Sequence, residues 1–97
     1  MSIAKVRVLA KTKTKNHALT NTTERYVILS GEARVTVAEQ SWSVKKGDVV
    51  TIQADQAQSI HNIGNQDLVF LAICTPRFIE HNYYELCLLY TSDAADE

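Results

Sequence analysis

The sequence predicts a small all-β domain, folded as a sandwich or a barrel. Three observations support this fold class. Apolar and polar residues alternate with a period of two along much of the chain, turn-forming residues interrupt the pattern roughly every 8 to 12 residues, and no segment has a strong helical period. The chain has 97 residues, which is enough for one hydrophobic core and too few for a second.

The first expected strands lie in the N-terminal third of the chain. A short strand is predicted at Ala4 to Val8, followed by a polar loop with a strand fragment at His17 to Leu19. Tyr26 to Leu29 is a continuous apolar run, which predicts a strand that is covered on both faces.

A hairpin is expected next, after a bend at Gly31, because glycine tolerates the backbone angles of tight turns. Residues Ala33 to Val37 alternate between apolar and polar, which predicts one buried and one solvated face. Ala38 to Gln40 forms the loop, and Ser41 to Lys45 forms the return strand.

The second half of the chain contains three more expected strands. Val49 to Ile52 follows a turn at residues 46 to 48, and Ser59 to Asn62 precedes a second turn at residues 64 and 65. Leu68 to Cys74 is the longest apolar stretch, and its Val, Phe and Ile content favours a strand over a buried helix. Pro76 is expected to end this strand because it lacks a backbone donor.

The C-terminal region divides into two parts. We expect Phe78 to Leu86 to be a short helical or irregular segment that packs Phe78, Tyr83 and Tyr84 on the outside of the barrel. Cys87 to Glu97 differs in composition and resembles the translation of a sequencing adapter, as in a metagenomic assembly. The sequence therefore predicts a domain at residues 1–86 and a non-native tail at residues 87–97, with a natural C-terminal strand as the alternative.

Charge and composition limit the expected partners. The net charge of −1 gives no general attraction to nucleic acid, and no apolar run approaches the roughly 20 residues that span a bilayer. The N-terminus lacks the apolar centre of a signal peptide, so a cytoplasmic protein is expected. The Lys11 to Lys15 cluster is read as a solvated face, with a phosphate contact as the alternative. Exposed sheet edges in so small a domain favour a homodimer.

Two patterns in the middle of the chain resemble the two sequence motifs of the cupin family. The first is Glu24 to Gly31, and the second is Gly47 to Ile52 followed by Asn62 to Asn65. With Leu68 to Phe78, the resemblance covers about residues 15 to 80 and is strongest to small cupins labelled mannose-6-phosphate isomerase-like. It implies a cupin-type β-barrel, also described as a double-stranded β-helix or jelly roll.

The resemblance also implies a metal site on side chains that face the barrel interior. The first motif of the family resembles His-x-His, four residues, Glu, six residues, Gly. In this chain His17 and Glu24 match, Leu19 falls on the second His, and Gln58 falls on the His of the second motif. Two of four expected ligands remain, so a divalent ion such as Zn, Mn, Fe or Ni is expected at low occupancy. Leucine offers no lone pair, and an amide oxygen is a poor substitute for imidazole.

Other residues near this site have alternative readings. Gln58 and Tyr26 are expected to line a small-molecule pocket, although Tyr26 also suits the core. His61 lies three residues beyond Gln58 and therefore faces the opposite side of a regular strand, unless a bulge reverses it. Glu24 is the candidate catalytic residue, and a surface carboxylate is the alternative. For His17, the alternative to a metal ligand is a solvent-exposed residue in a polar loop.

Three functions follow from these observations. The first is a cupin-fold protein with a small-molecule pocket and a metal site that is weakened or lost. The second is a working metal-dependent enzyme, either an isomerase, a dioxygenase or a hydrolase of small substrates. The third is a non-catalytic dimeric module with a structural or regulatory role. The sequence contains no phosphate-binding glycine loop, nucleophile elbow or His-Glu-x-x-His motif.

Overall fold

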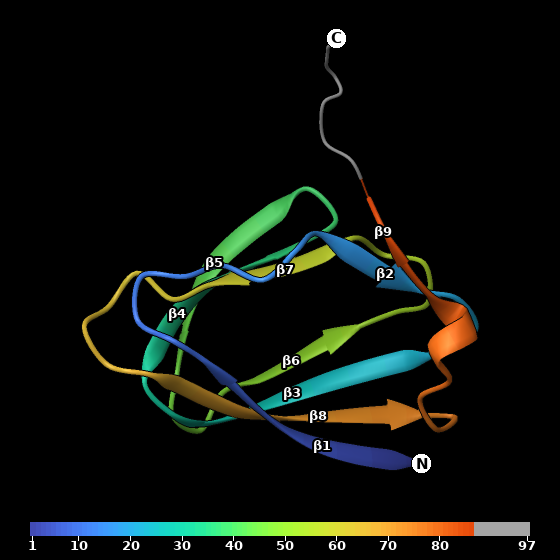
Figure 1. The fold of residues 1–97 in the computed structure, drawn as a ribbon, viewed down its shortest axis with the longest axis horizontal. Coiled ribbons are helices and arrows are strands. Elements are labelled where there is room, and N and C mark those ends of the chain that lie inside the picture. The colour runs from blue at the N-terminus through green and yellow to red at the C-terminus, as the bar shows by residue number, and fades with distance from the viewer. Residues whose placement is uncertain (87–97) are drawn as a thin grey trace, which may run out of the picture.

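A computed structural model describes residues 1–86, which fold as two antiparallel β-sheets that face each other (Figure 1). The all-β prediction is confirmed, and the expected tail at residues 87–97 lies outside the described part. The four-stranded sheet has the order β1 (Ser2–Val8), β8 (Leu68–Thr75), β3 (Thr23–Ser30), β6 (Val49–Ile52). The five-stranded sheet has the order β5 (Gln40–Lys45), β4 (Glu32–Val37), β7 (Gln58–His61), β2 (His17–Leu19), β9 (Tyr83–Glu85).

The core lies between the two sheets and is built from alternate residues of each strand. On β4, Ala33, Val35 and Val37 are buried while their neighbours face outward, as the alternating pattern predicts. The largest apolar side chains that are almost wholly buried are Ile28, Ile52, Ile60 and Leu68. Within residues 1–86, no helix is long and apolar enough to cross a bilayer.

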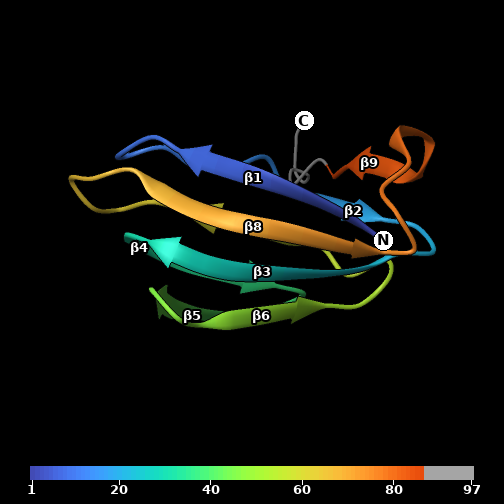
Figure 2. The ribbon, with the colours of Figure 1, turned by 90° about the horizontal axis from the view of Figure 1, so that it is seen from below.

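The expectation that the strand at Tyr26 to Leu29 is covered on both faces is wrong. Tyr26 and Ile28 point into the core, but Leu29 on the other face is 37 % exposed. No described element covers the outer side of the four-stranded sheet, which Figure 2 shows with β1, β8, β3 and β6 side by side. Apolar side chains are therefore present on both faces of a sheet that is buried on one face only.

Gly31 allows the chain to pass from β3 in one sheet to β4 in the other. Its φ is +88°, and a Cβ at this position would lie 2.8 Å from the backbone oxygen of Asp67. Gly47 also has a positive φ of +95°, but nothing lies within 4 Å of its Cβ position. Both turns need the left-handed backbone region, and only the Gly31 turn also needs a close approach by another strand.

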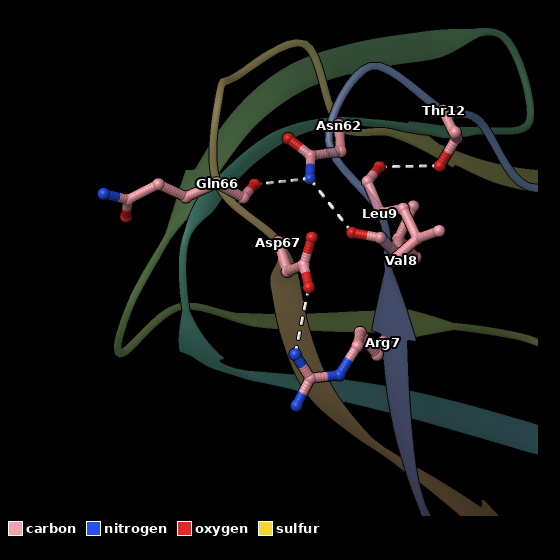
Figure 3. A network of polar contacts seen from close by, with 7 residues as sticks. All are labelled: Arg7, Val8, Leu9, Thr12, Asn62, Gln66 and Asp67. Atoms are coloured by element: carbon pink, nitrogen blue, oxygen red, sulfur yellow. Dashed lines mark hydrogen bonds and ion pairs between the residues drawn. The ribbon is translucent and has the colours of Figure 1, made fainter.

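Asn62 closes the end of the fold where β1 and β8 meet the loops. Its side-chain amide donates to the backbone oxygens of Val8 and Gln66, at 3.0 and 2.8 Å, and it is fully buried (Figure 3). Its Oδ1 accepts the backbone N–H of Gly64 at 3.0 Å. Asn62 therefore satisfies backbone groups at a strand end, and the Arg7–Asp67 ion pair lies beside it.

The expected irregular segment after β8 is in part a strand. A short 3₁₀ turn at Glu80–Asn82 (η1) leads to β9, which pairs with β2. Figure 1 shows this segment crossing from one sheet to the other at the same end as the N-terminus. Phe78 and Tyr83 both line an open cavity between the sheets, so Tyr83 does not pack on the outside as expected, whereas Phe78 is 42 % exposed. Tyr84 does lie outside and is 37 % exposed.

Candidate functional site

An open cavity of about 390 Å³ lies where β1, β8 and β3 of one sheet face β2 and β9 of the other. The cavity is smaller than many small-molecule sites, which span roughly 300 to 1,000 Å³. Its lining is mostly apolar, with a few polar side chains. The lining includes His17, Leu19, Glu24, Cys74 and Arg77.

The structure brings the residues singled out by the sequence to one place. His17 and Leu19 are two apart on β2, so both face the cavity. Glu24 reaches it from β3 in the opposite sheet. Gln58 on β7 is the direct cross-strand partner of His17 and is 1 % exposed. These four positions therefore converge between the sheets.

Gln58 is held from the core side by Tyr26. The Tyr26 hydroxyl donates a hydrogen bond to Oε1 of Gln58, and both side chains are buried. Burial raises the pKa of Tyr26 well above its usual value, and the nearby Glu24 carboxyl adds to this rise. The phenol is therefore a stable donor, and the amide oxygen that could have faced a ligand is already engaged.

Glu24 is a buried carboxyl group with incomplete hydrogen bonding. Glu24 is 8 % exposed, and its Oε1 has no hydrogen-bond partner among the described residues. Burial raises the pKa of Glu24, and this effect is partly opposed by the Gln58 amide, by His17 and by Cys74. Nε2 of Gln58 also lacks a hydrogen bond of good geometry within residues 1–86. The Gln58 amide is nevertheless close enough to Glu24 to favour the ionised form of its carboxyl group.

Cys74 is a further member of this cluster, and the cupin motifs did not indicate it. It pairs directly with Glu24 across β3 and β8, and its Sγ lies 3.8 Å from Oε2 of Glu24. Burial, with a contribution from Glu24, raises the pKa of Cys74 to about 11. The thiol is therefore protonated at neutral pH and acts as a weak donor to the carboxylate.

His17 is oriented by a backbone contact. Its Nδ1 lies 2.8 Å from the backbone oxygen of Lys15, and a carbonyl oxygen can only accept. Nδ1 therefore carries a hydrogen and is the donor in this contact. The ring also stacks on Tyr83 with centroids 5.0 Å apart. His61, by contrast, is exposed on β7 and is absent from the cavity lining, on the face predicted from its odd offset from Gln58.

The chain belongs to the cupin family. The cupin domain model matches residues 5–74. An uncharacterised protein of Methanocaldococcus jannaschii is 34 % identical over 77 residues, which cover 79 % of this chain and 62 % of that protein. The chain thus spans less than two thirds of this relative's length.

Solved cupin structures are similar to the described fold. A predicted oxalate decarboxylase of Thermotoga maritima is 30 % identical with a TM-score of 0.71, covering 74 % of this chain and 63 % of that one. A putative sugar phosphate isomerase of Acidithiobacillus ferrooxidans is 27 % identical with a TM-score of 0.68, covering 74 % and 47 %. Oxalate decarboxylase of Bacillus subtilis, described with Mn(II) centres, is 28 % identical with a TM-score of 0.78, covering 87 % and 23 %.

The Mn(II) centres of that relative raise the question of whether this site fits a metal ion. Among residues 1–86 there is no group of three or more His, Cys, Asp and Glu side chains placed to hold one. His17 and Glu24 supply one imidazole and one carboxylate, Leu19 supplies no donor, and the Gln58 oxygen already accepts from Tyr26. The donor set therefore does not fit a tightly held transition-metal ion.

Proposed function

We propose that this cupin domain binds a small organic molecule in the cavity between its sheets, and that its metal site is incomplete. The observation that carries the proposal is the pair of side chains at Leu19 and Gln58. Leu19 is 4 % exposed and apolar, and the Gln58 oxygen is engaged by Tyr26. The cavity keeps an apolar lining and a buried polar group in Glu24, which are typical of small-molecule sites.

A metal-dependent enzyme is the second candidate, and one observation favours it. Nδ1 of His17 donates to a backbone oxygen, which leaves Nε2 as the ring nitrogen that could bind a metal ion, and Oε1 of Glu24 has no partner among the described residues. Water and substrate would have to complete the coordination of a Zn, Mn, Fe or Ni ion, and Glu24 would then contact the reacting group. The likeness to a putative sugar phosphate isomerase is consistent with the mannose-6-phosphate isomerase-like subset, which we retain as a proposal.

Elemental analysis separates these candidates. The chain is purified without added metal, beside a Glu24→Ala variant, and divalent metals are measured per chain. We expect far less than one ion per chain in both proteins, because one imidazole and one carboxylate hold such ions weakly. Stoichiometric metal that disappears in the variant would contradict the proposal and favour the enzyme.

Restoring the missing donors provides a test in the opposite direction. The double variant Leu19→His, Gln58→His would place three imidazoles and one carboxylate around the cavity. We expect added Zn or Mn to raise the Tm of this variant and to leave the Tm of the parent unchanged, because a ligand stabilises only a protein that binds it. Leu19→Asn, Gln58→Asn is the matched control. An equal rise in the parent would show that its site already binds metal.

A further inference from the structure

An open groove of about 520 Å³ lies beside the edge strands β5 and β6, outside the cavity between the sheets. Figure 2 shows these two strands at the same side of the molecule, away from β1. Within residues 1–86, the groove and the cavity share no lining residue, so they are separate candidate sites. The volume of the groove lies within the range of small-molecule sites, roughly 300 to 1,000 Å³.

Trp42 is the aromatic residue of the groove lining. It lies on β5, at the edge of the five-stranded sheet, and its direct cross-strand partner is Val35. The two side chains therefore lie on the same face of the sheet. Val35 is fully buried, whereas Trp42 on the edge strand is 38 % exposed. A large aromatic side chain that remains accessible in a groove offers an apolar surface to a ligand.

The polar part of the lining offers both donors and acceptors of hydrogen bonds. Gln40 and Gln56 carry amides, Thr51 carries a hydroxyl and Glu39 carries a carboxylate. Oε1 of Gln56 accepts the backbone N–H of Gln53 at 2.8 Å, which leaves the amide nitrogen of Gln56 as a donor for a ligand. Glu39 is the one charged residue that the described chain contributes to this lining, and it joins neither of the two ion pairs found within residues 1–86.

Backbone hydrogen bonds hold the two loops of the groove together. The backbone N–H of Ala38, in the turn between β4 and β5, donates to the backbone oxygen of Ala57 at 2.8 Å. The backbone N–H of Gln56 donates to the oxygen of Gln53 at 3.2 Å, in the loop after β6. The groove is therefore formed by the fold itself, and a ligand would bind with little ordering of the backbone.

We propose that this groove binds a neutral saccharide, with one face of a sugar ring on Trp42 and its hydroxyls on Gln40, Thr51 and Gln56. A pyranose ring has an apolar C–H face and a rim of hydroxyls that donate and accept, which matches an aromatic surface with amides and a hydroxyl nearby. An anion is disfavoured by the Glu39 carboxylate. A quaternary ammonium ion is recognised by a cage of aromatic residues, and the described lining holds one such residue. The proposal goes beyond the function proposed for the cavity and does not depend on it.

The fluorescence of Trp42 reports on this groove directly, because Trp42 is the single tryptophan of the chain. The chain is titrated with cellotriose, maltotriose and mannotriose, and with sorbitol and choline as an open-chain polyol and a cation. We expect at least one trisaccharide to move the Trp42 emission to shorter wavelength and to protect it from quenching by acrylamide. Sorbitol and choline should do neither at equal concentration. The proposal is overturned if no trisaccharide protects Trp42, or if sorbitol or choline protects it as well as the best trisaccharide does.

Substitutions in the lining test the two kinds of contact. Gln40→Ala keeps the fluorophore and should lose about two- to tenfold in affinity for the trisaccharide that binds, the usual effect of one neutral hydrogen bond. Gln66→Ala, at an exposed position outside the groove, is the matched control and should keep the affinity. Trp42→Ala, followed by calorimetry, should lose about tenfold or more, and Trp42→Phe should lose less because it retains an aromatic ring. Unchanged affinity in both Gln40→Ala and Trp42→Ala would overturn the proposal and leave the function proposed for the cavity untouched.

Discussion

The hydrogen bond from Tyr26 to Gln58 is the residue-scale feature that most distinguishes this site. Removing the hydroxyl in Tyr26→Phe leaves a buried amide oxygen without a donor. We expect the free energy of unfolding to fall by about 1–3 kcal/mol, the usual cost of an unsatisfied buried group. Urea denaturation measures it. Tyr84→Phe is the control, because its hydroxyl contacts Asp55 at the surface and its loss should change stability by less than about 0.5 kcal/mol.

The buried carboxyl of Glu24 predicts a pH dependence of a definite sign. Burial raises the pKa of Glu24 above the ordinary value of 4.5. Between the unfolded-state pKa and the folded-state pKa, the folded state therefore binds the proton more strongly than the unfolded state does. This contribution to stability is fully present below about pH 4.5 and is lost as the pH rises through the folded-state pKa. The Glu24→Gln side chain cannot ionise, so the variant should not lose this stability as the pH rises.

The measurement is the difference in unfolding free energy between Glu24→Gln and the parent across this pH range. We expect the difference to move in favour of the variant as the pH rises from 4 to 7. A difference that moves toward the parent over the same range would mean that the Glu24 carboxylate is better stabilised in the folded state than in water, and the burial argument would be wrong.

The sequence located part of this site and missed the rest for a physical reason. The resemblance to the cupin motifs indicated that His17, Glu24 and Gln58 share one site, although they lie on the three separate strands β2, β3 and β7. Cys74 and Arg77 were not associated with them. The contact of Cys74 with Glu24 depends on the register between β3 and β8, which spacing along one strand does not reveal.

At the scale of elements, the two left-handed glycines provide a matched pair. Gly31→Ala strains the backbone and also places a Cβ against the Asp67 oxygen, where β3 turns into β4. Gly47→Ala strains the backbone alone. A strained residue costs about 1–3 kcal/mol, so we expect Gly47→Ala near the lower end and Gly31→Ala at or above the upper end. Thermal or urea unfolding of both variants measures the difference, and equal costs would contradict the role of the close approach.

The sequence predicted strands correctly where apolar and polar side chains alternate. It did not predict strands that form only because they pair with a neighbouring strand. The hairpin of β4 and β5 follows directly from its two-residue period. The strand β9 was missed because Tyr83, Tyr84 and Glu85 have no such period, and they become a strand by adding to the edge of β2. The apolar run in β3 was predicted to be covered on both faces, because the sequence alone does not show whether other elements cover the second face of a sheet.

At the scale of the whole molecule, the outer side of the four-stranded sheet predicts a surface for self-association. Its apolar side chains, which we name the outer apolar face, are Ile3, Val27, Leu29, Val49, Val69, Leu71 and Ile73. The cross-strand register also places Lys5, Arg7, Arg25 and Thr51 on this side, next to the apolar residues. Antiparallel sheets with one solvated side usually carry polar residues there. The homodimer expected from the sequence remains a prediction, and this face is where we expect it to form.

Val49→Lys tests the dimer. Val49 is 58 % exposed at the edge of the outer apolar face, so a lysine there should leave the fold intact while placing a charge in the interface. We expect light scattering to report a dimer for the parent and a larger monomer fraction for the variant. Ser43→Lys, exposed on β5 of the other sheet, is the control and should stay dimeric. A parent that is monomeric at all concentrations would exclude both the dimer and the non-catalytic dimeric module.

The cavity draws its walls from both extremes of the described residues, residues 2–6 at one end and residues 77–83 at the other. Neither half of the sequence can assemble it alone, and fraying at either extremity would open it while the central core stayed intact. Ligand affinity is therefore a reporter of complete folding, and loss of binding should precede loss of β-structure on gentle heating.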